Sequence, residues 1–193
     1  MLADKLKKYH LILASASPRR QQLLRDLGFD FEVRLKEIEE IYPKNLKAEE
    51  ITNYLAELKA KAFENELSNN DILITSDTIV WHEEKALEKP KNKTEAFEML
   101  KSLSGKTHKV ISSVCLKRTV ETLTFFDVTY VTFLHLNDEE IEYYIEQFKP
   151  FDKAGAYGIQ EWIGLIGVSK IEGSYTNVVG LPTHLIYKNL ILR

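Results

Sequence analysis

The stretch that decides the fold is residues 10–28, HLILASASPRRQQLLRDLG. It opens on a short apolar run, residues 10–14, which is bounded by polar residues as a buried strand would be. Ser17 is a preferred helix N-cap. Pro18 suits the first helical position, because an N–H at that position has no acceptor within the helix and proline therefore loses no hydrogen bond. Gly28 is expected to end the helix. The stretch therefore predicts a strand, a turn and a helix.

Further elements follow the same alternation and then become mostly extended. The expected strands lie at 29–35, 72–74, 110–116, 122–136, 153–160 and 164–171, and the expected helices at 47–67, 93–103, 138–148 and 181–192. Strands alternating with helices, followed by an antiparallel stretch, are typical of a mixed α/β fold. We expect one domain over residues 1–193. This domain could consist of two lobes with the active-site cleft between them.

Composition narrows the class of protein. Of the 193 residues 44% are hydrophobic and 28% are charged, with a net charge of -3 and one cysteine, Cys115. A single cysteine excludes an intramolecular disulfide, and the short apolar runs predict neither a membrane span nor a cleaved signal peptide. The small negative charge argues against a broad nucleic-acid surface. We therefore expect a cytoplasmic protein with neither a membrane nor a nucleic acid as partner.

The first strand-to-helix turn holds Ser15, Ser17, Arg19 and Arg20. A helix N-terminus presents unpaired N–H groups and partial positive charge, so hydroxyls and guanidiniums there form a candidate phosphate site. Arginine in the first turn opposes the helix dipole, and a bound anion would explain two in a row. The alternative is an ordinary serine cap followed by two solvated arginines.

Two further groups could meet near the sheet. Asp77 follows directly after the apolar run 72–74, and ligands of open α/β sheets sit beyond the carboxyl ends of strands. A carboxylate between apolar residues needs a metal, a cation or a hydrogen-bond donor, although it could also be a turn cap. Lys59 falls on the apolar face of its helix by the 100° periodicity. It either reaches past the core to solvent or pairs with an anion.

Other charged residues complete the inventory. Glu39 and Glu40 lie in an acidic loop, where one could share Mg²⁺ with Asp77, or both could simply be solvated. Lys89 precedes a proline and is therefore held extended. Walker, Rossmann, H-E-x-x-H and G-x-S-x-G motifs are all absent from the sequence. Cations and carboxylates of this kind indicate a polyphosphate bound through a divalent cation, with water as the acceptor.

At these residues the sequence resembles the Maf family of nucleoside triphosphate pyrophosphatases, also called septum formation inhibitors. The similar blocks are LASASPRRQQLL (13–24), EIEE (37–40), LAELKA (55–60), SDTIV (76–80), EKP (88–90), LSGKTHKV (103–110), KAGAYGIQ (153–160) and TNVVGLP (176–182). They occur in the family's order over nearly the whole chain. The resemblance implies a mixed, elongated sheet flanked by helices, akin to inosine triphosphate pyrophosphatases, and a homodimer.

The resemblance also implies a reaction. It is the hydrolysis of dTTP and UTP, or of modified pyrimidine nucleotides, to the monophosphate and pyrophosphate with Mg²⁺ or Mn²⁺. By position, Asp77 matches the catalytic proton acceptor, and Glu40 matches the acidic residue that shares the metal with it. Arg20, Lys59 and Lys89 match basic phosphate contacts, with Ser15 and Ser17 in the phosphate-binding turn. The positions that match base selection in the dTTP/UTP branch are Arg19, Thr78 and Gln160.

The sequence departs from the family pattern at two places, and one rival function is compatible with the same binding residues. The loop before Lys89 lacks the glycines that the family commonly has, and Ser112-Ser113 replaces the usual Thr-Gly. The rival is a nucleotide-binding regulator of cell division that hydrolyses little. Such a protein would not require an intact Asp77 and Glu40.

Overall fold

The computed structural model describes residues 6–191, which fall into two compact units. The first unit holds the chain up to Asp77, Ser112–Asp127 and the chain from Gly180. The second holds Thr78–Ile111 and Val128–Val179. None of the helices in the described part is long and apolar enough to cross a membrane.

Within the described residues seven strands form one mixed sheet in the order β2-β1-β3-β5-β6-β7, with β4 paired to β3. The strands are β1 (His10–Leu13), β2 (Glu32–Val33), β3 (Asp71–His82), β4 (Lys85–Leu87), β5 (Thr107–Lys117), β6 (Thr122–Phe133) and β7 (Val168–Glu172). β1 runs parallel to β2 and β3, whereas β4 and β7 are antiparallel to β3 and β6. The expected mixed α/β sheet flanked by helices is confirmed.

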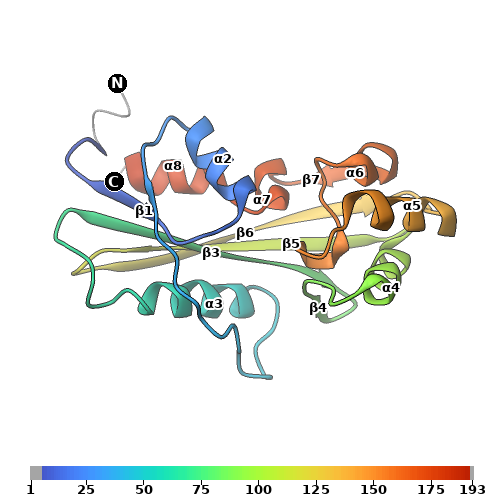
Figure 1. Cartoon of the computed structure of the whole chain (residues 1–193), viewed down its shortest axis with the longest axis horizontal. Coiled ribbons are helices and arrows are strands. Elements are labelled where there is room, and N and C mark those ends of the chain that lie inside the picture. Colours follow the sequence, from blue (N-terminus) through green and yellow to red (C-terminus); the bar gives the residue numbers. More distant parts are fainter. Residues whose placement is uncertain (1–5, 192–193) are drawn as a thin grey trace. The chain divides into compact units, whose positions relative to one another are not determined.

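Helices cover both faces of the strands in the first unit (Figure 1). These helices are α2 (Pro18–Asp26) and α8 (Thr183–Ile191) on one face and α3 (Glu49–Lys61) on the other. Leu24 and Ile186 pack with Ile74, while Ala56 and Leu73 belong to the opposite cluster. Successive residues of a strand point to opposite faces, so β3 serves both clusters.

The second unit has a core of its own. Its helices are α4 (Lys93–Leu103), α5 (Asp138–Phe148), the 3₁₀ turn η1 (Ala154–Ala156), α6 (Trp162–Gly167) and α7 (Tyr175–Val179). α4 packs against α5 and η1. Phe133, Tyr144 and Tyr157 are buried in the same apolar cluster. Asn137 caps α5 in a capping box with Glu140, which confirms the expected start of that helix.

Most predicted elements exist, with shifted ends. Ser17 accepts the N–H of Arg20 as N-cap of α2, and Gly28 follows the helix at φ +76°. α4 has its expected bounds. The helix expected over 47–67 is shorter, the strand over 29–35 shrinks to two residues, and α7 was not predicted. The closing helix is described up to Ile191, and Leu192 lies outside the described residues.

The expectation that Asp77 follows the end of a strand is wrong. β3 continues through Asp77 to His82, and it pairs with β4 from Val80 to His82. The β-branched and aromatic residues 79–81 favour extended structure, so the polar residues at 75–78 interrupt the apolar pattern without ending the strand. Asp77 is therefore held in the middle of a strand.

The strand expected over 153–160 is also wrong, and the strand expected over 164–171 is confirmed only for residues 168–171, which belong to β7. Residues 154–156 form a 3₁₀ turn, and residues 162–167 form α6. Gly155 and Ala156 both have left-handed φ values, of 65° and 60°, which differ from those of a regular strand. Periodicity alone cannot distinguish a short apolar strand from a short buried helix, and that ambiguity covers α6.

The first departure from the family includes the turn between β3 and β4. His82 pairs with Lys85 across a two-residue hairpin, and both turn residues, Glu83 and Glu84, have left-handed φ values of 48° and 58°. Such turns favour glycine or asparagine because a Cβ is strained at positive φ. Glu83 accepts a hydrogen bond from Lys106, and this bond, followed by the charge of Lys106, holds the pKa of Glu83 below its usual value.

Glu84→Gly is therefore expected to stabilise the protein by about 1 kcal/mol, because glycine takes a left-handed φ without strain. The measurement is the free energy of unfolding in urea. Glu37→Gly is the matched control, since Glu37 is exposed and has a negative φ. The control should destabilise slightly or have no effect. A Glu84→Gly protein less stable than wild type would contradict the prediction.

Candidate active site

The turn between β1 and α2 folds around Ser15 and Ser17. Ser15 is 8% exposed, and its Oγ accepts the N–H of Ser17 at 3.3 Å. Ser17 Oγ accepts the N–H of Arg20 at 3.4 Å, which caps α2. Both hydroxyls therefore order the start of the helix that was predicted to bind phosphate.

Arg20 ties this turn to two other segments of the first unit. Its Nε donates to the carbonyl oxygen of Gly180, and its Nη1 donates to that of Ser76, both at 2.9 Å. Burial lowers the pKa of Arg20, and the negative charge of Asp77 acts in the opposite direction. The alternative of a solvated arginine is wrong for Arg20. Neither carbonyl could have been assigned from the sequence, since no residue type marks a carbonyl acceptor.

Asp77 faces α3 because of the alternation along β3. Leu73 packs with the α3 residues Ala56 and Ala60, and Thr75 Oγ1 donates to the carbonyl oxygen of Ala56 at 2.6 Å. Asp77 lies two residues further on and points to the same face. It is 6% exposed, which confirms the expected burial of this carboxylate.

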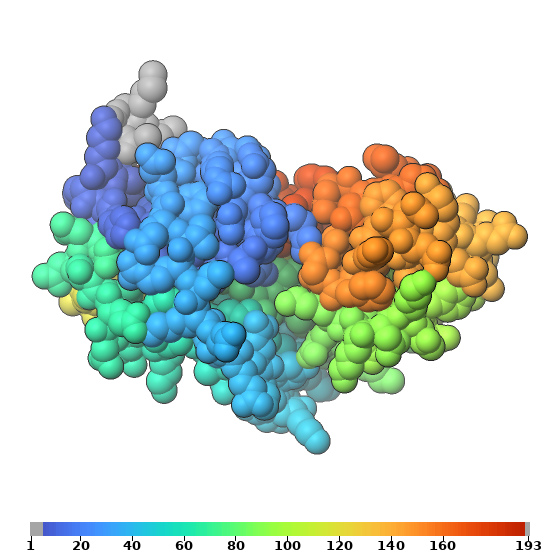
Figure 2. All heavy atoms as spheres, in the orientation of Figure 1, coloured from blue at the N-terminus to red at the C-terminus, as the bar shows by residue number. Residues whose placement is uncertain are grey.

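Lys59 joins two carboxylates of the first unit. Its Nζ lies 2.7 Å from Oδ1 of Asp77 and 3.1 Å from Oε2 of Glu40. The side chains of Lys59 and Asp77 are only 14% and 9% exposed. Of the two alternatives for Lys59, pairing with an anion is therefore confirmed. Glu40 comes from the loop between β2 and α3, which runs over the surface of the first unit (Figures 1 and 2).

This carboxylate pair fits a divalent cation of the Mg²⁺ type. Asp77 and Glu40 approach the same ammonium group, so both carboxylates face one region. Within residues 6–191 no group of three or more candidate ligands is found. Mg²⁺ is usually bound by one or two carboxylates together with substrate phosphates, so two protein ligands suffice.

The second departure from the family is a hydrogen-bonded contact with α3. Ser113 Oγ lies 2.6 Å from Oγ1 of Thr52 and donates to Oδ1 of Asn53 at 2.7 Å. Thr52 and Ser113 are fully buried. The hydroxyl that replaces the family's glycine is thus satisfied, and it ties the helix that carries Lys59 to β5.

Three of the other predicted site residues belong to the second unit. Thr78 follows Asp77 on β3, Lys89 lies after β4, and Gln160 lies just before α6. Lys89 and Gln160 are exposed. Arg19, in the first unit, is partly exposed on α2. That these residues meet Asp77 around one substrate stays a prediction.

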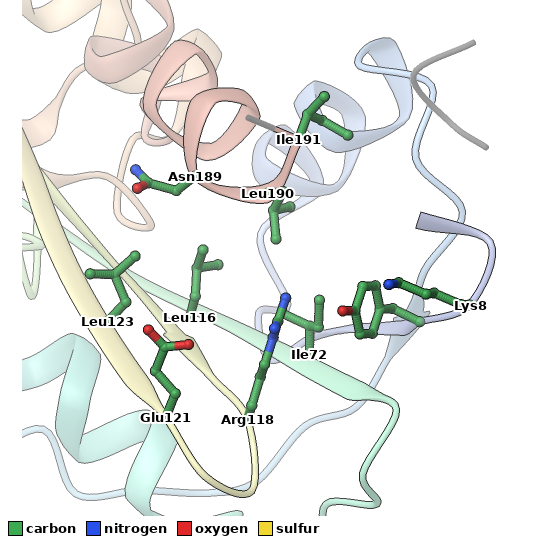
Figure 3. Close-up of a pocket in the computed structure, with 10 residues that line it drawn as sticks. Lys8, Ile72, Leu116, Arg118, Glu121, Leu123, Asn189, Leu190 and Ile191 are labelled. Atoms are coloured by element: carbon green, nitrogen blue, oxygen red, sulfur yellow. The ribbon is translucent and has the colours of Figure 1, made fainter. Parts of the chain in front are cut away.

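A pocket of about 680 Å³ lies elsewhere in the first unit (Figure 3). Its lining residues are Lys8, Tyr9, Ile72, Leu116, Arg118, Glu121, Leu123, Asn189, Leu190 and Ile191. The guanidinium of Arg118 lies 4.6 Å from the ring centre of Tyr9. None of the predicted site residues lines this pocket, so it is separate from the site around Asp77.

Comparison with known proteins agrees with the resemblance seen in the sequence. The family model described as Maf-like protein matches residues 10–192. A relative in Flavobacterium johnsoniae named dTTP/UTP pyrophosphatase is 65% identical over 98% of each chain. A relative of the same name in Flavobacterium psychrophilum is 58% identical over 99% of this chain and 98% of its own.

Similarity to solved structures is weaker. The Ham1 protein of Staphylococcus aureus aligns with a TM-score of 0.44 at 14% identity, over 64% of this chain and 71% of its own. A dITP/XTP pyrophosphatase of Mycobacterium abscessus aligns with a TM-score of 0.39 at 12% identity, over 66% of this chain and 75% of its own. No argument about the site depends on either structure.

Arg20→Lys is expected to lower the free energy of unfolding by about 2 kcal/mol, because one ammonium group cannot reproduce the forked contact with two carbonyl oxygens. Urea unfolding measures the change. Arg25→Lys, on the exposed side of the same helix, is the matched control and should stay within about 0.5 kcal/mol of wild type. Equal stabilities of the two variants would show that the carbonyl contacts of Arg20 contribute little.

Proposed function

Because the chain belongs to the Maf family, we propose that it is a nucleoside triphosphate pyrophosphatase that hydrolyses dTTP and UTP. The products are the nucleoside monophosphate and pyrophosphate, so the bond cleaved lies between the α and β phosphates. Relatives at 65% and 58% identity carry the name dTTP/UTP pyrophosphatase and match over nearly their whole length.

The observation that carries the proposal is the contact of Lys59 with both Asp77 and Glu40. It gathers one cation and two carboxylates on one side of the sheet in the first unit. Hydrolysis of a phosphoanhydride needs a base for water and positive charge for the phosphates. A protein that only bound a nucleotide would gain nothing from two carboxylates, since they repel phosphate.

Asp77 is the proposed general base. Oδ1 of Asp77 is bound to Lys59, so the carboxylate is held in one orientation and Oδ2 takes the proton of the attacking water. Lys59 compensates the charge of the carboxylate and then approaches the phosphates. Arg20 and Lys89 stabilise the negative charge that develops on the leaving pyrophosphate.

Asp77 and Glu40 are the residues that would hold a divalent cation such as Mg²⁺ or Mn²⁺. When bound, that cation supplies charge neutralisation to the triphosphate. The roles of the side chains are unchanged when the cation is bound. Glu40 orients Lys59, and Asp77 receives the proton.

Base selection is assigned to Arg19, Thr78 and Gln160, on the positions that they share with the dTTP/UTP branch. Gln160 carries both a donor and an acceptor, which suits the imide edge of thymine or uracil. Modified pyrimidine nucleotides with the same edge belong to the same substrate class. A cytoplasmic homodimer without nucleic-acid or membrane partners completes the proposal.

Incubation of the purified protein with dTTP and UTP is expected to release pyrophosphate and the monophosphate in equal amounts. Chromatography of the products measures both. Asp77→Asn should lower kcat by about 10²- to 10⁴-fold, because the amide cannot act as a base. Release of orthophosphate would refute cleavage between the α and β phosphates.

The control variant for Asp77→Asn is Asp26→Asn, an exposed carboxylate on α2 that should keep wild-type turnover. Circular dichroism of both variants checks the fold. A wild-type protein that binds dTTP without turnover would favour the rival regulatory function.

Removal of divalent metal with a chelator is expected to abolish turnover, and added Mg²⁺ or Mn²⁺ should restore it. The expectation follows from a site with two carboxylates for a substrate with four negative charges at most. Glu40→Gln should raise the Mg²⁺ concentration needed for half-maximal rate about tenfold, which initial rates across a Mg²⁺ titration measure. Full turnover in the presence of chelator would contradict a metal-dependent reaction.

A further inference from the structure

Within the segment Lys153–Glu161 of the second unit, the non-glycine residue Ala156 holds an unfavourable backbone conformation. Gly155 and the non-glycine residue Ala156 both have left-handed φ values, of 65° and 60°. A Cβ on Gly155 would lie 2.7 Å from Cγ2 of Val80, so the backbone packs closely on β3. Strain of this kind persists only where the surrounding contacts enforce it. The contacts that enforce it can be identified.

Tyr144 of α5 makes the central contact. Its side chain is fully buried, and its hydroxyl oxygen accepts the N–H of Gly158 at 3.0 Å. The same hydroxyl donates to Oε2 of Glu161. Burial, followed by the hydrogen bond to Glu161, raises the pKa of Tyr144, so the group stays protonated and keeps its donor role. One hydroxyl therefore holds two points of the segment.

Lys153 closes the segment at its other end. Its Nζ lies 3.1 Å from Oε1 of Glu161, and the residue is only 8% exposed. Asp152 pairs with the same ammonium at 2.6 Å. A buried ammonium group must be paired, so Lys153 draws the end of the segment at Glu161 back toward its start.

Gln160 lies on this fixed backbone. A Cβ on Gly158 would lie 2.9 Å from Nε2 of Gln160 and 2.8 Å from Cδ of Glu161. The amide of Gln160 thus folds back over the residue whose N–H is bound by Tyr144. Gln160 itself is exposed, so contacts beneath it set its position.

We infer that Tyr144 is a positioning residue which, together with Glu161 and Lys153, fixes the segment 153–161 and with it the amide of Gln160 for reading the base. The inference rests on the proposed function, because it takes Gln160 to contact the base of the substrate. Tyr144 acts through Gly158 and Glu161 and has no contact with the substrate.

The test is Tyr144→Phe, which removes one oxygen and keeps the ring that stacks on Phe148. The ratio of kcat/KM for dTTP to that for dCTP is expected to fall about tenfold, mainly through KM for dTTP, as for one lost hydrogen bond. Hydrogen–deuterium exchange of the amides in 153–161 should become faster. General loss of stability would lower the rates on both nucleotides together and leave their ratio unchanged.

Tyr143→Phe is the matched control, since it removes the same atom from the neighbouring residue, which is 50% exposed. It should keep the wild-type ratio and the wild-type exchange. Glu161→Gln keeps an acceptor for Tyr144 but weakens the pair with Lys153, and a smaller fall of the ratio is expected. This second variant decides the matter if Tyr144→Phe does not fold.

A Tyr144→Phe protein with faster exchange and an unchanged ratio would overturn the positioning of Gln160. Unchanged exchange would overturn the inference as a whole. If the wild-type protein hydrolyses neither dTTP nor UTP, the proposed function fails, and exchange alone then decides whether Tyr144 fixes the segment. Faster exchange in Tyr144→Phe than in Tyr143→Phe supports it, and equal exchange refutes it.

Discussion

Asp77 is an almost completely buried carboxylate, and its charge is balanced by the ammonium group of Lys59 at 2.7 Å. An isolated charge in the interior would cost several kcal/mol, so neither residue can be buried here without the other. The pair therefore requires α3 to lie on the face of β3 toward which Asp77 points. Thr75 and Leu73 follow the same alternation and contact the same helix. The same position of α3 therefore buries its apolar side chains and places Lys59 beside Asp77, the proposed base.

The sequence predicts those features of the structure that depend on neighbouring residues. The cap at Ser17, the glycine after α2 and the start of α5 at Asp138 depend on residues within one or two turns, and the sequence predicts all three correctly. The apolar side of Lys59 followed from helical periodicity, because the whole stripe lies on one helix. The partner of Lys59 does not follow from periodicity, since a lysine at that position can either reach solvent or pair with an anion.

The missed features depend on contacts between distant segments. The carbonyl oxygens of Ser76 and Gly180 accept hydrogen bonds from Arg20, and a carbonyl carries no residue-specific signal. The sequence predicts a strand where Gly155 and Ala156 form a turn, because the left-handed backbone of this turn is stabilised from outside, by β3 beneath Gly155 and by Tyr144 beyond it. The length of β3 is missed for a similar reason. The polar residues at 75–78 suggest that the strand ends, whereas pairing with β4, a separate segment, keeps β3 extended.

Each unit contains a lysine with two carboxylates, and the two sets differ in what they restrain. Lys59 joins α3, β3 and the loop that carries Glu40, which are far apart in the sequence. Lys153 joins the two ends of one short segment, with Asp152 and Glu161 as its partners. The contacts of Lys59 thus bring together groups on separate elements, whereas those of Lys153 fix the shape of one segment. Because Glu161 also accepts the hydroxyl of Tyr144, its charge serves the shape of the segment and would be costly to redirect to a substrate. For this reason we assign chemistry to the carboxylates near Lys59 and positioning to the carboxylate near Lys153.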